Sequence, residues 1–338
     1  MVLALALPGA SRCDPLATGA GSATAAGAPC GRSCNVLPVE HLIATHRQTR
    51  VRSSRVPRRA VGPISGALRL VRVENVLIVL LLTMIGAGLG ATGLGYTGLG
   101  WMAVLIPAFT VAVGNVVNDL VDADLDAIGR PWRAIPSGHV SQRVARRIHI
   151  LGSSIVVLLS VAVLSPPMLA FALLMLATAY AYSYALKGVP LLGNLAVAFQ
   201  VAAVPYFGGM STGAPRSDAL AFSVGLFGAF VVFEVAKTAS DRWYDQLGIR
   251  TIATVLSSRG VAMVLLGVSM LNALVLGFMV DRGSLTAATA LLLMVPLTPI
   301  LWFSLLAVFG RRSLDGIEQH VWLSKALYVA ALLTYVLR

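Results

Sequence analysis

Residues 118–126 read Asn-Asp-Leu-Val-Asp-Ala-Asp-Leu-Asp and follow directly on the apolar run 101–117. This stretch places four of the chain's fourteen acidic residues within eight positions. In a helix, Asn118, Asp122 and Asp126 recur every four residues, so their side chains point the same way. Like charges this close repel one another and require a compensating cation. The stretch therefore predicts a helix end that presents carboxylates to a bound cation.

A second, smaller acidic cluster lies far along the chain, at Asp241 and Asp245. These residues are again four positions apart, and they follow the largely apolar run 219–236. Six of the fourteen acidic residues thus lie in two clusters, each at the end of a hydrophobic segment. We expect both clusters to face one cavity and to hold a divalent metal ion there.

The ligand types favour magnesium. Mg²⁺ prefers oxygen ligands, keeps some of its waters and completes its shell with phosphate oxygens of a substrate. The one histidine close to either cluster is His139, in the loop after the first, so zinc is disfavoured. The three cysteines, Cys13, Cys30 and Cys34, lie far from both clusters, so we expect neither a disulfide framework nor a thiolate metal site.

Composition identifies the class of protein. Hydrophobic residues make up 57% of the chain and charged residues 12%, and the mean hydropathy is +0.82. Ordinary soluble domains carry about 25% charged residues. The sequence therefore predicts an all-α polytopic membrane protein, with apolar runs near the ~20 residues that a spanning helix needs. Nine such segments are expected, at about 74–95, 99–120, 145–164, 167–186, 190–210, 218–238, 260–280, 285–309 and 320–337.

The net charge of +12 follows membrane topology rather than nucleic-acid binding. With the N-terminus in the cytoplasm, the loops on the opposite side hold only two basic residues, Arg216 and Arg282. This asymmetry predicts that the N-terminus and both acidic clusters face the cytoplasm, with some attraction to anionic lipid. The loops and flanks on the cytoplasmic side hold twelve basic residues: Arg130, Arg133, Arg143, Arg146, Arg147, Lys187, Lys237, Arg242, Arg250, Arg259, Arg311 and Arg312.

The chain divides into residues 1–62, a basic N-terminal extension that we expect to be disordered, and a membrane domain at 63–338. The extension is rich in Ala, Gly, Ser, Pro and Arg and shows no sustained periodicity. A targeting peptide is the alternative, since the composition is Arg-rich and poor in acids.

Several basic and polar residues beside the clusters are candidates for binding an anionic group. Arg130 and Arg133 follow the first cluster and can take negative charge in bidentate fashion. Lys187 either reaches a phosphate or extends from a helix end toward the aqueous phase. Lys237, four residues before Asp241, either contacts phosphate or neutralises that carboxylate. Further candidates lie at the mouth of the first segment and next to the first cluster: Arg72, Asn75 and Asp119.

Residues 88–93 match the dinucleotide-binding pattern G-x-G-x-x-G, but we reject that interpretation. The pattern lies at the end of a membrane segment, and no strand–turn–helix unit surrounds it. Glycines at this place more readily permit close helix packing or form a loop.

Taken in order, the motifs resemble those of the UbiA superfamily of intramembrane prenyltransferases. They are N-D-x-x-D-x-x-x-D at 118–126, R-P-x-R-x-I-P-S-G at 130–138, Y-S-x-x-L-K at 182–187, and D-x-x-x-D at 241–245 followed by G-I-R-T. The resemblance covers about residues 65–338. It implies a nine-helix bundle around a central cavity with a cytoplasmic cap, in which Mg²⁺ holds an isoprenyl diphosphate between two aspartate-rich motifs.

Carried over to this chain, the resemblance assigns roles to individual residues. It implies that Lys237 binds diphosphate, assisted by Lys187 and Arg133, with Tyr184 a further substrate-binding candidate. The metal ligands would be Asn118, Asp122, Asp126, Asp241 and Asp245, and the four aspartates and Lys237 would be catalytic.

The chain departs from the family pattern at Thr238, where the second motif often has Asp, and at Gly129 and Ala134 around the first loop. These departures leave the subgroup, and hence the acceptor, open. The first motif and its loop are most similar to the digeranylgeranylglyceryl-phosphate synthase and homogentisate-type branches.

The expected activity is Mg²⁺-dependent transfer of a prenyl group from an isoprenyl diphosphate to a lipophilic or aromatic acceptor, such as an alcohol or a ring. Three alternatives remain: a UbiA-type terpene cyclase, a CDP-alcohol phosphotransferase and a cation transporter. The second expects Asp-Gly and Ala-Arg within its acidic motif, where this chain has Ala123-Asp124. The third more often shows inverted repeats and broken helices.

Overall fold

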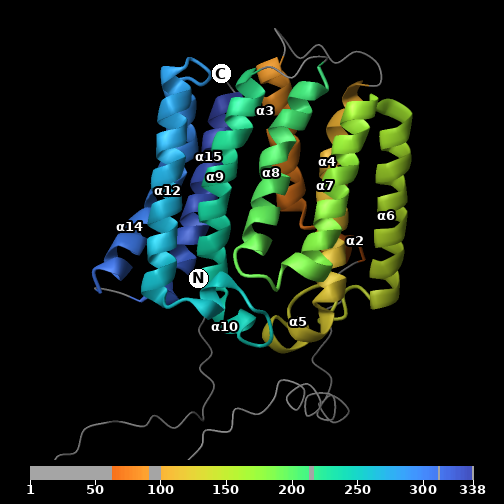
Figure 1. The fold of residues 1–338 in the computed structure, drawn as a ribbon. Helices are drawn as coiled ribbons and strands as arrows, with labels where there is room; N and C mark the ends of the chain where they lie inside the picture. Colours follow the sequence, from red (N-terminus) through yellow and green to blue (C-terminus); the bar gives the residue numbers. More distant parts are fainter. Residues whose placement is uncertain (1–62, 91–99, 213–216, 311–312, 337–338) are drawn as a thin grey trace, which may run out of the picture. The chain divides into compact units, whose positions relative to one another are not determined.

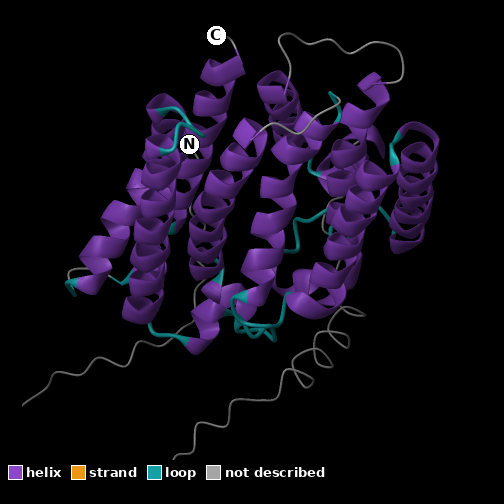
Figure 2. Cartoon of the chain, turned by 45° about the horizontal axis from the view of Figure 1, so that its top comes forward, coloured by secondary structure: helices purple, strands orange, loops and turns teal. Residues whose placement is uncertain are grey.

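The computed structural model describes residues 63–90, 100–212, 217–310 and 313–336, and within these ranges every regular element is a helix. Figure 1 shows the long helices running alongside one another, and Figure 2 shows the loops that join them. The predicted extension at 1–62 lies outside the described residues, as do all three cysteines. The long helices are α3 (Val73–Gly90), α4 (Gly100–Val121), α6 (Gln142–Val163), α7 (Pro166–Ala181), α8 (Leu192–Met210), α9 (Ser217–Ser240), α12 (Ser258–Asp281) and α15 (Glu318–Val336). The shorter ones are α2 (Pro63–Val71), α5 (Ala123–Gly129), α10 (Arg242–Asp245), α11 (Ile252–Val255), α13 (Ala287–Met294) and α14 (Thr298–Val308).

The helices confirm a polytopic membrane protein. Seven helical stretches of the described chain are long and apolar enough to span a membrane, and α2 with α3 makes an eighth if this pair, bent by 54°, is one span. The count of nine is not confirmed. Helix α15 occupies the place of the ninth segment but is not among the seven, because Gln319, His320 and Lys325 interrupt its apolar sequence.

Helix α9 lies at the centre of the described helices. In the most apolar stretch of α9, 72% of the helix is buried, against 17% in the corresponding stretch of α6 and 22% in that of α12. Helices α6 and α12 therefore turn most of their surface outward. Helix α9 packs against α8 and α12 and also contacts α3 and α15. The second acidic cluster directly follows this buried helix.

Helices α3 and α8 approach each other closely because glycines face backbone at the contact. A Cβ atom on Gly86 would lie 1.8 Å from the carbonyl oxygen of Pro205, and one on Gly208 would lie 2.1 Å from that of Thr83. A Cβ atom on Gly88, within the rejected nucleotide-binding pattern, would meet no neighbouring atom within 4 Å. The close contact of α3 with α8 is therefore made at Gly86, two residues before that pattern, and not at Gly88.

Helices α5 and α10 lie at the same end of the helical bundle (Figure 1). Each is a short continuation of a long helix, α5 after α4 and α10 after α9. The first cluster runs from the last turn of α4 into α5, and the second runs from the junction after α9 to the end of α10. The fold thus brings both clusters to one end, as the sequence predicts.

Candidate active site

The first acidic cluster keeps its helical spacing across the junction of α4 and α5. The amide of Asp122 donates to the carbonyl of Asn118 at 2.9 Å, and the amide of Asp126 donates to the carbonyl of Asp122 at 2.8 Å. Asp119, Asp122 and Asp126 are all buried, whereas Asp124 is exposed. The periodicity therefore separates three interior carboxylates from one that faces outward.

Two arginines converge on Asp119. Its Oδ1 lies 2.5 Å from Nη2 of Arg72 and 2.7 Å from Nη1 of Arg133. Arg72 also donates to the side-chain oxygen of Asn118 at 3.3 Å. Arg72 occupies the break between α2 and α3 with a φ of 53°, a left-handed conformation that costs energy in a non-glycine residue. This bend directs its guanidinium to the acidic cluster.

Asp122 and Asp126 each pair with a donor from a distant part of the chain. Lys187, just after the π-helical turn Tyr182–Leu186, forms an ion pair with Oδ2 of Asp122. The hydroxyl of Tyr244 donates to Oδ1 of Asp126 at 2.7 Å. Oδ2 of Asp126 is buried, accepts no hydrogen bond and lies 3.4 Å from Arg133. Burial raises the pKa of the Asp126 carboxyl above its ordinary value.

The second cluster is tied to the first by Arg130 and Tyr244. Arg130 pairs with Asp241 at 2.7 Å, and its guanidinium lies 3.8 Å from the centroid of the Tyr244 ring. Asp245 accepts a hydrogen bond from the Thr251 hydroxyl at 3.0 Å. Burial raises the pKa of the Asp245 carboxyl to about 6, so a cation beside it would stabilise its charged form. The loop after one cluster thus binds the carboxylate of the other.

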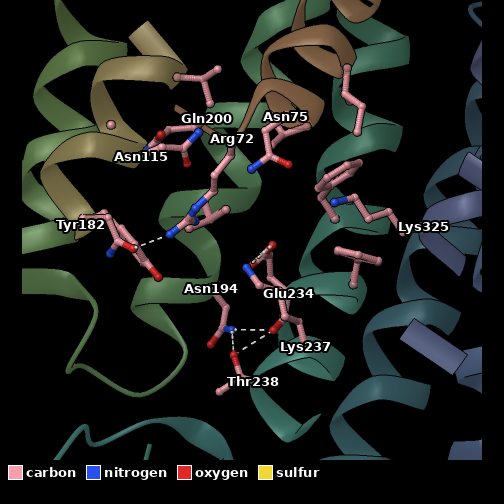
Figure 3. A pocket seen from close by; sticks show the side chains of 18 of the residues that line it. Arg72, Asn75, Asn115, Tyr182, Asn194, Gln200, Glu234, Lys237, Thr238 and Lys325 are labelled. Atoms are coloured by element: carbon pink, nitrogen blue, oxygen red, sulfur yellow. Dashed lines mark hydrogen bonds and ion pairs between the residues drawn. The ribbon is translucent and has the colours of Figure 1, made fainter. Parts of the chain in front are cut away.

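A cavity of about 650 Å³ opens beside both clusters. Figure 3 shows part of its wall, with Arg72, Glu234 and Lys237 among the labelled side chains. Its polar wall includes most of the site residues predicted from sequence: Arg72, Asn75, Asn118, Arg133, Lys187, Lys237, Asp241 and Asp245. Asp119, Asp122 and Asp126 do not line it, because their basic and hydroxyl partners hold them behind its surface. Deeper in the bundle the wall is apolar, formed by residues such as Val201, Val204, Phe230 and Phe233. The cavity therefore joins a charged end to a hydrophobic compartment.

Two predicted contacts differ from the structure. Tyr184 is 66% exposed, stacks on Tyr180 and does not line the cavity, whereas Tyr182 does. Lys237 does not neutralise Asp241, which pairs with Arg130. Its ammonium instead lies 3.2 Å from Glu234, one turn earlier on α9.

Sequence reasoning missed Glu234, Tyr244 and Asn194. Glu234 carried a signal, since it is a single acid inside the apolar run before the second cluster. Asn194 donates to the hydroxyl of Thr238 at 2.7 Å, so the threonine that departs from the family motif has a structural partner. The partnership of Tyr244 with Asp126 spans 118 residues, and local sequence gives no sign of it.

The donor set fits a hard divalent cation such as Mg²⁺. The clusters offer carboxylate and amide oxygens, including the buried Oδ2 of Asp126 that accepts no hydrogen bond. Among the described residues, no three acidic, histidine or cysteine side chains converge on one point. Each ion would therefore take few ligands from the chain and leave positions for water and phosphate oxygens, as Mg²⁺ commonly does.

Known proteins resemble this chain in sequence. A family model described as the UbiA prenyltransferase family matches residues 79–332. A digeranylgeranylglyceryl phosphate synthase of Korarchaeum cryptofilum is 35% identical over 158 residues, which cover 45% of this chain and 54% of that protein. The corresponding protein of Sulfolobus acidocaldarius is 29% identical over 209 residues, covering 61% and 75%. The chain thus spans about half the length of the first of these relatives and three quarters of the second.

Solved structures share the fold at low sequence identity. A UbiA homologue from Archaeoglobus fulgidus bound to GPP and Mg²⁺ superposes with a TM-score of 0.61 at 19% identity, covering 81% of this chain and all of that one. A structure described as giving insight into digeranylgeranylglyceryl phosphate synthase in membranes has a TM-score of 0.65 at 17% identity and covers 81% and 98%.

Proposed function

The chain belongs to the UbiA prenyltransferase family. We propose that it is a prenyltransferase, which moves the prenyl group of an isoprenyl diphosphate onto a lipophilic acceptor within the membrane. The observation that carries the proposal is the convergence of two aspartate clusters beside one cavity with a charged end and an apolar interior. The charge asymmetry of the loops supports a site that opens to the cytoplasm.

The basic residues of the site are suited to an anionic leaving group. Arg72, Arg133, Lys187 and Lys237 line the cavity, where they can donate to diphosphate oxygens. Asn118 and the four aspartates of the two motifs would hold Mg²⁺, with few of these ligands on each ion, and the metal would supply positive charge against the departing diphosphate.

The apolar part of the cavity is suited to the prenyl chain. Its wall can hold the hydrocarbon tail and keep water from the allylic cation that forms when the C–O bond breaks. An acceptor nucleophile then attacks that carbon and loses a proton. The neighbour described as bound to GPP and Mg²⁺ supports this pairing of ligands for the fold.

For the acceptor we propose a glycerophosphate lipid bearing a free hydroxyl. The support is that curated relatives from several archaea are named digeranylgeranylglyceryl phosphate synthase. The test is incubation of membranes containing the chain with geranylgeranyl diphosphate and geranylgeranylglyceryl phosphate, an aromatic acid, or no acceptor. An ether lipid supports the proposal, a prenylated ring points to an aromatic acceptor, and a hydrocarbon formed without acceptor identifies a cyclase.

Removal of divalent metal is expected to abolish turnover. Without Mg²⁺ the departing diphosphate loses its main source of charge neutralisation, so we expect prenyl transfer to fall by at least roughly a thousandfold in excess EDTA. Restoring Mg²⁺ should return full activity. The measurement is ether-lipid formation from labelled geranylgeranyl diphosphate, with membranes lacking the chain as background. Undiminished turnover in EDTA would contradict a metal-dependent mechanism.

Tyr244→Phe is expected to weaken metal use without removing it. The hydroxyl that orients Asp126 is lost, but the ring beneath Arg130 remains. Loss of an outer partner of a metal ligand typically costs about 10- to 100-fold in affinity or activity. The measurement is the Mg²⁺ concentration that gives half-maximal turnover, compared with Tyr184→Phe, which removes the hydroxyl of an exposed tyrosine. An unchanged Mg²⁺ requirement in Tyr244→Phe would show that Asp126 needs no such support.

A further inference from the structure

Glu234 is a carboxylate of the cavity wall that the metal site does not use. Five of the acidic residues that the structure describes line the cavity. Asp241 and Asp245 belong to the second cluster, and Glu74 and Glu318 are exposed. Glu234 is 8% exposed and belongs to the most buried span, α9. A carboxylate at such a position is costly and marks a functional role by default.

The backbone of α9 is fixed at this residue. The carbonyl of Glu234 accepts a hydrogen bond from Nδ2 of Asn194 at 3.0 Å and another from the hydroxyl of Thr238 at 2.8 Å. The two carboxylate oxygens lie 3.2 and 3.4 Å from the ammonium of Lys237. Figure 3 shows Glu234 and Lys237 facing the space into which Arg72 also points. Asn194 and Thr238 thus hold the backbone at Glu234, whereas within the described part of the chain the carboxylate has one hydrogen-bond partner, Lys237, at long distance.

Its level along α9 places Glu234 between the two parts of the cavity. Asp241 lies seven residues further on, about 10 Å along the axis at 1.5 Å per residue. Phe230 lies one turn to the other side and also lines the cavity. Its ring is 5.7 Å from that of Tyr328 and 5.8 Å from that of Phe233. Glu234 thus sits where the charged end gives way to an aromatic wall.

That boundary is where the reacting carbon of an allylic diphosphate belongs. The diphosphate would lie at the aspartate clusters and the hydrocarbon against the apolar wall. Aromatic faces one turn away can stabilise a cation at this level. A carboxylate at the same level is within reach of the nucleophile that attacks the cation.

We propose that Glu234 is the general base that takes the proton from the acceptor. In the step, the bond between the allylic carbon and the diphosphate oxygen breaks and its electron pair leaves with diphosphate. An electron pair on the acceptor oxygen forms the new C–O bond, and the proton of that hydroxyl passes to the Glu234 carboxylate. This inference rests on the proposed function, and it adds the residue that accepts the proton when the acceptor attacks.

The experiment separates ionisation from transfer. For Glu234→Gln we expect ether formation from geranylgeranyl diphosphate and geranylgeranylglyceryl phosphate to fall by about 10²- to 10⁴-fold, the usual contribution of a general base. Diphosphate release measured without acceptor, and its dependence on Mg²⁺ concentration, should match the wild-type chain. Glu234→Asp should recover part of the transfer rate. Asp281→Asn is the control, since it replaces a carboxylate by an amide at an exposed position that does not line the cavity.

Two results would overturn the proposal. Wild-type transfer by Glu234→Gln would assign the proton to another group, such as the departing diphosphate. A parallel loss of transfer and diphosphate release would mean that the carboxylate supports the fold or the ionisation step. Failure of the proposed function looks different, because the wild-type chain itself would then show neither diphosphate release nor transfer.

Discussion

Asp122→Asn and Asp241→Asn are each expected to lower prenyl transfer by on the order of a hundredfold to a thousandfold. Asparagine keeps the size of the side chain but removes the charge that a hard cation requires. In Asp122→Asn the ammonium of Lys187 also loses its carboxylate, and in Asp241→Asn Arg130 loses the contact that ties the two clusters together. Each change therefore removes a proposed metal ligand and a positioning contact at once.

The chain contains a matched control for this experiment. Asp124 belongs to the same acidic stretch but is exposed, so Asp124→Asn makes the same chemical change outside the site. We expect wild-type turnover from it. The measurement is turnover of geranylgeranyl diphosphate in membranes, with the amount of folded protein checked by size-exclusion chromatography. Wild-type turnover by both Asp122→Asn and Asp241→Asn would end the proposal of a metal site at these clusters.

Local periodicity explains why much of the site could be predicted. A spacing of four residues defines a helix face, so Asn118, Asp122 and Asp126 could be assigned to one side of a helix before any coordinates were considered. The helical backbone hydrogen bonds across the junction of α4 and α5 preserve that spacing. Apolar runs ending in acidic clusters likewise predicted the position of both clusters relative to the membrane segments.

Departures from regular helix explain part of what could not be predicted. In the π-helical turn after α7, the amide of Lys187 donates to the carbonyl of Tyr182, five residues earlier. The additional residue per turn rotates the side chains, and Tyr182 rather than Tyr184 lines the cavity. The left-handed backbone of Arg72 is a second such case, since residue type gives no indication of it.

Contacts between distant residues explain the rest. Each carboxylate partner comes from another part of the chain: Lys187 for Asp122, Tyr244 for Asp126, and Arg130 for Asp241. Which cation meets which carboxylate depends on how the helices are placed in space. The sequence could therefore assign basic residues to the site but not pair them, and it gave no sign that Lys237 lies beside Glu234 rather than Asp241.

The shape of the cavity where its charged end meets its apolar part depends on how closely α3 and α8 pack. Helix α3 follows Arg72 and supplies Asn75, and α8 supplies Asn194, which holds the backbone at Glu234. A separation of the two helices would move these groups relative to one another. The close approach is made possible by two glycines, so their substitution is a direct test of the framework.

Gly208→Ala is expected to destabilise the fold severely. The added Cβ would lie 2.1 Å from the carbonyl oxygen of Thr83 and 3.0 Å from the amide nitrogen of Ala87. Both neighbours are backbone atoms of α3, so no side chain can move aside and the helices must separate. The cost is expected to reach about 3 kcal/mol, the upper end for overpacking, although alanine is the better helix former. The measurement is the thermal unfolding midpoint in detergent together with the yield of monodisperse protein.

The matched control is Gly267→Ala on α12. Gly267 is exposed and has open space where a Cβ would lie, so only helix propensity acts there. We expect that variant to keep or gain stability, by up to about 1 kcal/mol. Because both variants replace a helical glycine by alanine, the difference between them isolates the contact with α3. Equal unfolding midpoints for Gly208→Ala and Gly267→Ala would mean that the two helices have room to spare, and that the geometry of the cavity does not depend on this contact.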